Sequence, residues 1–221
     1  MYMTEITICY GMTETAPVSV QSSPSDLVER RVGTVGRVHP HLEIKIVDEN
    51  GKVVPRGKLG ELCVRGYSVM LGYWEDNDKT QEVIDVAKWM HTGDIAEMDE
   101  EGFVKIKGRI KDVVIRGGEN LFPKEIEDFL YTHPDVSDVQ VIGLPDPRYG
   151  EELCACIILH EHHQINEEAI RQYCAEHISH NKVPRYVRFF TEFPMTASGK
   201  AQKFKLQELM RQELNLLEDI A

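Results

Sequence analysis

The sequence predicts an α+β protein that has a β-rich first half and a smaller α+β unit behind it. Between residues 42 and 109, short apolar segments with alternating polarity are separated by turn residues, which is typical of antiparallel strands. From residue 110 onward, strand-like segments alternate with helical patterns over about 110 residues, a common domain size. We therefore expect two units, 1–110 and 111–221.

The elements of the first unit follow from residue 42. Before that point, a short apolar stretch ends at Tyr10 and Gly11, and a loop rich in Ser, Pro and Asp follows. Because apolar residues in this segment follow neither a helical nor a strand period, we expect it to be irregular. It should be unable to form a core alone, and it should expose apolar surface. The expected strands are 42–48, 59–66, 91–99 and 102–109, with a short helix at 78–84 and a hairpin turn at 99–102.

The second unit is expected to contain four strands and three helices. Pro123 suits the first turn of a helix, where its missing N–H has no partner in any case, and Asn166 is a natural N-cap. The expected strands are 112–118, 136–144, 152–159 and 186–190, and the helices begin near 123, 166 and 204 and end near 133, 176 and 217.

Composition excludes several classes of function. The chain has 25 basic and 37 acidic side chains, a net charge of -12 and a sequence pI near 5.2. Such a chain lacks the basic face with which proteins grip nucleic acid. No apolar run approaches the roughly 20 residues that cross a bilayer, and the first residues carry no targeting pattern.

The cysteine pattern is typical of a reducing compartment. The number is odd, and the spacing shows no CxxC pair and no zinc-like pairing with histidine, so we expect free, structural thiols that behave as small hydrophobic side chains. The histidine-rich run at 160–163 is expected to be a solvated loop. The five cysteines are Cys9, Cys63, Cys154, Cys156 and Cys174, of which the third and fourth share one face of a buried strand.

Two segments of the first unit carry groups that suit a nucleotide. Tyr10, Gly11, Thr13 and Glu14 bring together an aromatic ring, a hydroxyl and a carboxylate, which could stack on a base, bond a phosphate and bind Mg²⁺. A turn with a helix cap explains the same pattern. Asp94, directly after a glycine, could accept two hydrogen bonds from ribose hydroxyls, although an Asx turn is an equal explanation.

Two further segments combine glycine with charge. Residues 108–120 contain three glycines and five charges, which indicates either a hinge beside a charged ligand or a plain charged linker. Lys200, on a glycine-flanked loop, could reach a phosphate as a point charge, or it could be a solvated loop lysine. The loop is not a Walker A motif, because Pro194 and Ala201 replace required residues.

Taken in order, these segments resemble the adenylate-forming acyl-CoA synthetase superfamily (AMP-binding enzymes). The resemblance covers essentially the whole chain and rests on YGMTE, GELCVRG, HTGD, GRIKDVVIRGGEN with PKEIE, and PMTASGKAQK. RGYSVMLGYW, IRGGENLFPKEIEDF, GEELCACI and SGKAQKFKLQE look most like medium-chain fatty-acyl ligases, which include a mitochondrial member. The resemblance implies that 1–110 is the β-rich end of a large adenylation domain and that 111–221 is a small, mobile C-terminal domain.

The resemblance also implies roles for individual residues. ATP, Mg²⁺ and CoA are the implied co-substrates of a fatty acid. Tyr10 would stack on adenine beside Gly11, Thr13 would meet the α-phosphate, and Glu14 would help to bind Mg²⁺. The remaining implied residues are Asp94 and Arg109 on the ribose, Lys111 at the hinge, Gly118 on the CoA tunnel, and Lys200 as the adenylation lysine.

Parts of the superfamily pattern do not occur in this chain. A Ser/Thr/Gly-rich phosphate-binding loop, most of the acyl pocket and most of the large domain would precede YGMTE. We therefore expect the chain to be the last third of a ligase and inactive by itself, with the missing N-terminal domain as its partner. An aryl, bile or amino acid substrate stays open, as does a non-catalytic module that binds CoA or acyl-CoA.

Overall fold

The computed structural model describes residues 5–197 and 199–216 and divides the chain into two compact units, residues 1–111 and 112–221. Within these described ranges, every helix is too short or too polar to cross a membrane. The C-terminal helix was expected to end at residue 217, which lies outside the described residues.

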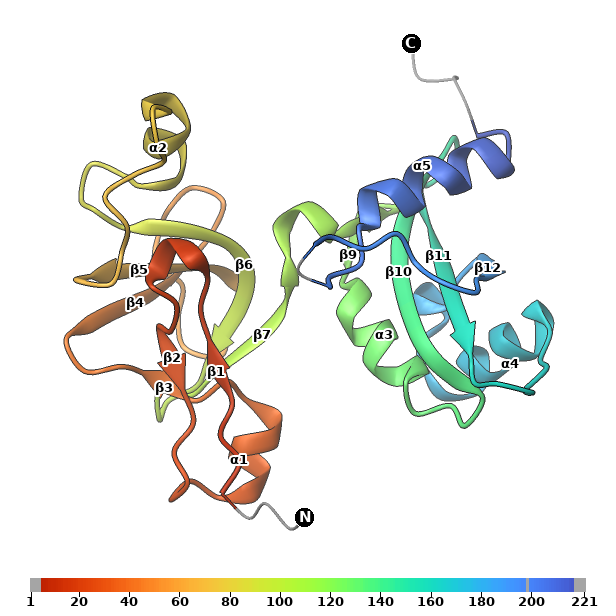
Figure 1. Cartoon of the computed structure of the whole chain (residues 1–221), viewed down its shortest axis with the longest axis horizontal. Helices are drawn as coiled ribbons and strands as arrows, with labels where there is room; N and C mark the ends of the chain where they lie inside the picture. Colours follow the sequence, from red (N-terminus) through yellow and green to blue (C-terminus); the bar gives the residue numbers. More distant parts are fainter. Residues whose placement is uncertain (1–4, 198, 217–221) are drawn as a thin grey trace. The chain divides into compact units, whose positions relative to one another are not determined.

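The first unit is built on a four-stranded antiparallel sheet with the strand order β4-β5-β6-β7 (Figure 1). All four strands, the helix between the second and the third, and the hairpin at its end were predicted and are confirmed. Alternation places Ile46, Leu62 and Val104 in one buried cluster, which is the core of this unit. The elements are β4 (Leu42–Val47), β5 (Gly60–Gly66), α2 (Asn77–Val83), β6 (Met90–Met98) and β7 (Val104–Arg109).

The segment before β4 is more regular than expected. It forms a small antiparallel sheet whose strands are two residues long, too short to leave a period in the sequence. Val20 is fully buried in the same cluster as Ile46. Leu27 and Val32, by contrast, are 72% and 73% exposed, as expected for apolar surface in this segment. The elements are β1 (Cys9–Tyr10), the 3₁₀ turn η1 (Thr13–Thr15), β2 (Val20–Gln21), α1 (Val28–Gly33) and β3 (Arg37–Val38).

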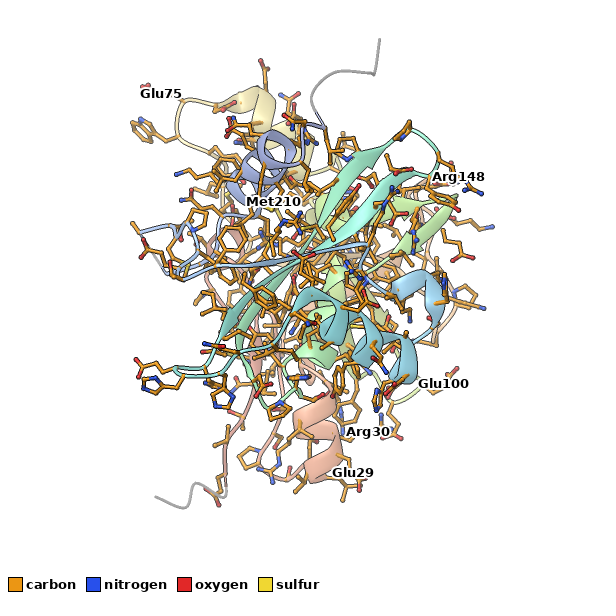
Figure 2. All side chains as sticks on the ribbon, turned by 90° about the vertical axis from the view of Figure 1, so that its right-hand side faces the viewer. Glu29, Arg30, Glu75, Glu100, Arg148 and Met210 are labelled. Atoms are coloured by element: carbon orange, nitrogen blue, oxygen red, sulfur yellow. The ribbon has the colours of Figure 1, made fainter. Side chains whose placement is uncertain are left out.

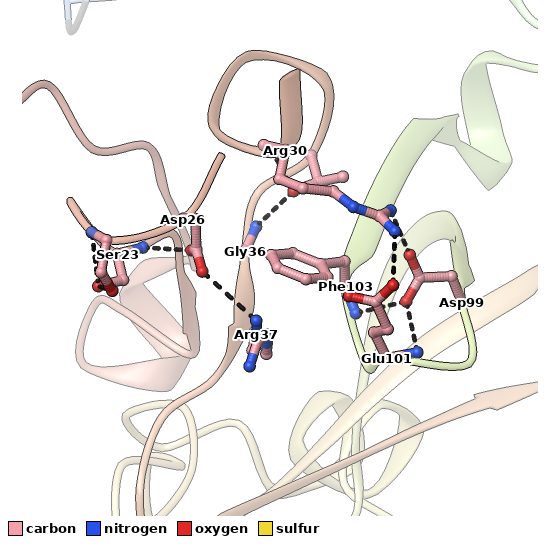
Figure 3. A network of polar contacts seen from close by, with 10 residues as sticks. Ser23, Asp26, Arg30, Gly36, Arg37, Asp99, Glu101 and Phe103 are labelled. Carbon is pink, nitrogen blue, oxygen red and sulfur yellow. Dashed lines mark hydrogen bonds and ion pairs between the residues drawn. The ribbon is translucent and has the colours of Figure 1, made fainter. Parts of the chain in front are cut away.

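Ion pairs connect the N-terminal segment that precedes β4 to the turn between β6 and β7 (Figure 3). Arg30 of α1 lies 2.6 Å from Asp99 and 3.0 Å from Glu101. The Phe103 ring lies between two guanidinium groups, 4.9 Å from that of Arg30 and 4.2 Å from that of Arg37. Cation–π contacts and ion pairs therefore hold α1 and β3 against the hairpin.

The second unit is a five-stranded sheet with helices on both faces (Figure 1). Its long central hairpin turns near Arg148 (Figure 2). The strand β12 then runs parallel to β11. The strands are β8 (Val114–Arg116), β9 (Glu119–Leu121), β10 (Val136–Asp146), β11 (Gly150–Leu159) and β12 (Tyr186–Phe189), and the helices are α3 (Pro123–Leu130), α4 (Glu167–His177) and α5 (Lys203–Glu213).

Alternation along β11 explains how the two faces are covered. Leu153 packs in the cluster that contains residues of α3 and α4, whereas Cys154 and Cys156 pack with Leu206 and Met210 of α5. The predicted sharing of one face by these two cysteines is confirmed. A strand with both faces covered reads as a continuous apolar run, which is the pattern seen here.

The other cysteines only partly follow the expectation. All five thiols are free, and four are buried, but Cys9 is exposed because it lies on an edge strand of the small N-terminal sheet. The histidine-rich loop at 160–163 is exposed as predicted. The spacing in the sequence shows no cysteine–histidine pair, but in the structure Cys63 Sγ lies 3.6 Å from His91 Nδ1 of the neighbouring strand.

The helix α4 begins at the predicted N-cap. The Asn166 side chain accepts a hydrogen bond from the backbone N–H of Ala169 at 2.9 Å. We expect Asn166→Ala to lower the free energy of unfolding by about 1 kcal/mol, because a backbone donor in the first turn loses its partner. Urea denaturation of the two proteins measures the difference. Asn166→Asp keeps an acceptor and should unfold like the parent; equal losses in both variants would contradict a capping role.

Candidate nucleotide site

Three of the sequence-predicted residues meet in the first unit. The Tyr10 hydroxyl donates to Asp94 Oδ2 at 2.6 Å, across 84 residues of sequence, and Arg109 Nε lies 3.3 Å from Asp94 Oδ1. Asp94 is only 9% exposed, whereas Arg109 is open to solvent. The Asx turn considered for Asp94 is wrong, because both carboxylate oxygens engage side chains from other strands.

Local backbone geometry holds Asp94 in place. Thr92 donates its hydroxyl to the carbonyl of Leu62 at 2.7 Å and accepts the Asp94 N–H at 3.1 Å. Gly93 has a φ of +71°, a value that favours glycine, and its N–H donates to Glu61 Oε1 at 3.0 Å. Sequence reasoning missed Glu61; its only signal was a carboxylate directly before the apolar residues 62–64 of the same strand.

The pKa of Tyr10 lies well above its usual value. Burial is the main cause, followed by the hydrogen bond to the Asp94 carboxylate. An unfolded tyrosine ionises near pH 10. The buried, protonated Tyr10 therefore contributes fully to the stability of the folded state below that pH, and this contribution is lost as the pH rises through the higher pKa of the folded state.

We expect Asp94→Asn to lower the Tyr10 pKa toward its ordinary value, because the neighbouring negative charge is gone. Ultraviolet titration of the parent, Asp94→Asn and Tyr10→Phe proteins isolates the Tyr10 transition. An unchanged transition in Asp94→Asn would show that burial alone keeps the phenol protonated.

Glu14 has a partner that sequence reasoning did not identify. Tyr73 donates its hydroxyl to Glu14 Oε1 at 2.9 Å, and burial together with this bond raises the pKa of Tyr73. The signal available was an aromatic residue beside Gly72 in a turn. In the described part of the chain, no lysine or arginine pairs with Glu14, and Thr13 beside it is exposed. A carboxylate held in this way suits one ligand position on Mg²⁺ alongside phosphate oxygens.

Gly11 is required because there is no space for a side chain at this position. A Cβ atom placed on Gly11 would lie 1.8 Å from the carbonyl oxygen of Pro17, far inside contact distance. Its φ is not positive. The backbone segments at Gly11 and Pro17 therefore approach closely, and the 3₁₀ turn η1 between them carries both Thr13 and Glu14.

Lys200 lies on a tight loop of the second unit. The backbone N–H of Thr196 donates to the Lys200 carbonyl at 2.8 Å, and the Lys200 N–H donates to the Thr196 hydroxyl at 3.0 Å. Its side chain is exposed and has no ion pair within the described residues. Lys203 differs, since its ammonium lies 2.6 Å from Glu127 and is structural. Ser198 of the same motif lies outside the described residues.

Gly118 lies in a hairpin that the sequence reading missed. The strand expected at 112–118 ends at Arg116, and Gly117 and Gly118 turn the chain into β9 with φ of +59° and +85°. Two glycines between apolar segments were the available signal. Gly118 is exposed, and a Cβ there would meet no atom within 4 Å. Residues 108–120 thus form strands and turns, not an irregular linker.

The sequence-predicted residues fall into separate groups. The first unit brings Tyr10, Asp94 and Arg109 together and pairs Glu14 with a different residue, while Gly118 and Lys200 belong to the second unit. Lys111 is exposed on the 3₁₀ turn η2 (Ile110–Asp112), where the division between units falls. A hollow of about 700 Å³ between α1 and the β6–β7 hairpin is lined by none of these residues.

Comparison with protein-family models gives two matches. Residues 1–74 match the AMP-binding enzyme model, and residues 125–200 match the model of the AMP-binding enzyme C-terminal domain. The first match lies within the first structural unit, and the second match lies within the second unit.

Curated relatives and solved structures agree with these models. The chain is 54% identical over 215 residues to the medium-chain acyl-CoA ligase ACSF2, mitochondrial, of Bos taurus, covering 97% of this chain and 35% of that protein. It is 50% identical to a putative acyl-CoA synthetase, YngI, of Bacillus subtilis, covering 98% and 40%. ATP-bound MatB from Rhodopseudomonas palustris aligns with a TM-score of 0.87 and 34% identity over 94% of this chain and 41% of that one. The chain thus spans about a third of the length of the curated relatives it matches.

Proposed function

This chain belongs to the AMP-binding enzyme family, and from that premise we propose that it supplies the C-terminal third of an AMP-forming acid:CoA ligase. Such a ligase joins a carboxylate to the α-phosphate of ATP, releases pyrophosphate, and passes the acyl group to the thiol of CoA. The proposal assigns residues 1–110 to the end of the adenylation domain and 111–221 to the C-terminal domain. The observation that carries it is the Tyr10, Asp94 and Arg109 cluster.

The cluster has the chemistry that a ribonucleoside needs. The Tyr10 ring offers a flat apolar face for adenine, and the buried carboxylate of Asp94 offers two acceptors for ribose hydroxyls. Arg109, whose Nε lies 3.3 Å from that carboxylate, would contact the ribose side. Thr13 would donate to the α-phosphate, and Glu14 would hold Mg²⁺, whose charge offsets that of the phosphates.

The second unit would complete the chemistry. Attack of a carboxylate on the α-phosphate brings anions together, so the ammonium of Lys200 would stabilise the charge that develops in the transition state. Rotation about Lys111 would then replace the Lys200 loop by the β8–β9 hairpin. Because Gly118 has no side chain, pantetheine could pass close to the backbone. The two half-reactions would thus use different faces of one domain.

A medium-chain fatty acid is the proposed substrate, with a mitochondrial location. The support is the name and the 54% identity of the Bos taurus relative, against 34% for a solved anthranilate CoA ligase. Aryl, bile and amino acids are the alternatives for the same chemistry.

Exchange of radioactive pyrophosphate into ATP tests the proposal on a complete ligase that contains this chain. We expect exchange that depends on added acid and is fastest with medium-chain fatty acids. Exchange with an aryl, bile or amino acid alone would replace the proposed substrate but keep the ligase. If a folded protein shows no exchange with any acid yet binds CoA, the ligase proposal is wrong and a binding module replaces it.

A further inference from the structure

Three metal-ligand side chains lie on one face of the first unit's sheet, beside the proposed nucleotide site. Glu61 and Cys63 are two residues apart in β5, so their side chains point to the same side. His91 of β6 lies directly opposite Cys63 in the strand register. Because this group joins residues 28 and 30 positions apart, no spacing in the sequence reveals it.

The distances approach those of a coordination shell. His91 Nδ1 lies 2.7 Å from Glu61 Oε2 and 3.6 Å from Cys63 Sγ, and the three ligand atoms all lie within 4.8 Å of one another. Tetrahedral zinc with ordinary bond lengths places sulfur and nitrogen ligands about 3.6 Å apart, and nitrogen and oxygen ligands about 3.3 Å apart. The sulfur–nitrogen edge already fits, and the nitrogen–oxygen edge needs to lengthen by about half an ångström.

We propose that Glu61, Cys63 and His91 bind one zinc-class divalent cation, with a fourth position open to solvent. Thiolate, imidazole and carboxylate together favour zinc over Mg²⁺ or Ca²⁺, which prefer oxygen alone. Cys63 is fully buried, whereas the side chains of His91 and Glu61 are 30% and 19% exposed, so an ion can enter from their side.

Binding displaces one proton from the protein. Burial, assisted by the Glu61 charge, raises the pKa of the Cys63 thiol to about 12, so the metal-free thiol is protonated at neutral pH. A bound ion would take the place of that proton and of the hydrogen bond between His91 Nδ1 and Glu61 Oε2. Lys45 and Asp85 also face this thiol with opposite charges.

A bound ion would consolidate the turn that carries Asp94. Coordination through Glu61 Oε2 leaves Oε1 bonded to the Gly93 N–H, one residue before Asp94. This consequence rests on the proposed nucleotide site. Ion binding itself does not depend on the nucleotide site. A binding test can therefore fail or succeed independently of the proposed function.

Titration of the full chain with Co²⁺ tests the site, in a Cys9→Ser background that removes the exposed thiol. We expect one equivalent to produce a thiolate-to-cobalt charge-transfer band, which Zn²⁺ abolishes by displacement. Cys63→Ser should eliminate the band. Glu61→Gln keeps the thiol and should weaken binding by at least about 100-fold, since loss of an outer partner alone costs about 10–100-fold.

Cys174→Ser is the matched control, because Cys174 is equally buried but lies in α4. That variant should keep the band, and cobalt bound at the histidine-rich loop would give none, because no thiol is involved. The proposal is overturned if no band forms, if the band survives Cys63→Ser, or if Glu61→Gln binds cobalt like its parent.

Discussion

Replacing Lys200 by alanine in a complete ligase that contains this chain should slow acyl-adenylate formation by about 100- to 1000-fold. The reason is electrostatic: the ammonium would act on negative charge that develops only when the carboxylate attacks the α-phosphate. The side chain is exposed and has no ion pair within the described residues, so its loss should leave the fold intact. Pyrophosphate release after rapid mixing measures the first half-reaction.

The second half-reaction provides the contrast. When purified acyl-adenylate and CoA are supplied directly, Lys200→Ala should form thioester at close to the parent rate. Lys205→Ala is the matched control, because it removes another exposed lysine from the same segment, and it should leave both steps unchanged. Equal losses in both half-reactions of Lys200→Ala would contradict the proposed role.

Gly118→Leu should have the opposite effect, slowing thioester formation by about 100-fold, the loss expected when a reacting group is misplaced by about 1 Å. In this chain a Cβ on Gly118 meets no atom within 4 Å, so the added side chain has room in the unliganded protein. It would occupy the path proposed for pantetheine. Adenylate formation should stay near the parent rate, because Lys200 is untouched.

Backbone strain is the competing explanation, since leucine rarely adopts the φ of +85° found at Gly118. Gly102 has the same φ of +85° and also has open space around it. Gly102→Leu therefore carries the same local strain in a turn of the first unit, away from the proposed tunnel. If both variants lose thioester formation equally, strain accounts for the effect and the tunnel assignment is wrong.

Most regular elements could be predicted from the sequence alone. The alternation in β4 to β7, the Pro123 start of α3 and the Asn166 cap of α4 are local signals, because each arises from contacts within a few residues. The elements that were missed are short. The two-residue strands β1, β2 and β3 leave no period, and β9 has only three residues after its glycine turn.

The site residues divide in the same way. Their chemistry could be predicted from residue types and order, and residues 1–74 and 125–200 match the two models of AMP-binding enzymes. The sequence could not show that the Tyr10 hydroxyl bonds Asp94, that Tyr73 holds Glu14, or that Gly11 is needed for the approach of Pro17. These contacts join segments far apart in the chain, so only folding brings them together.

By itself, then, the sequence determined the class of the fold, most of its strands and helices, and the kind of chemistry its polar segments carry. Tertiary structure decided which of those groups meet. Strand pairing set Asp94 opposite Arg109 and Cys63 opposite His91, because the register of a sheet depends on hydrogen bonds between strands. The carboxylate of Asp94 is buried and accepts the Tyr10 hydroxyl, whereas Lys200 is exposed on a loop of the second unit.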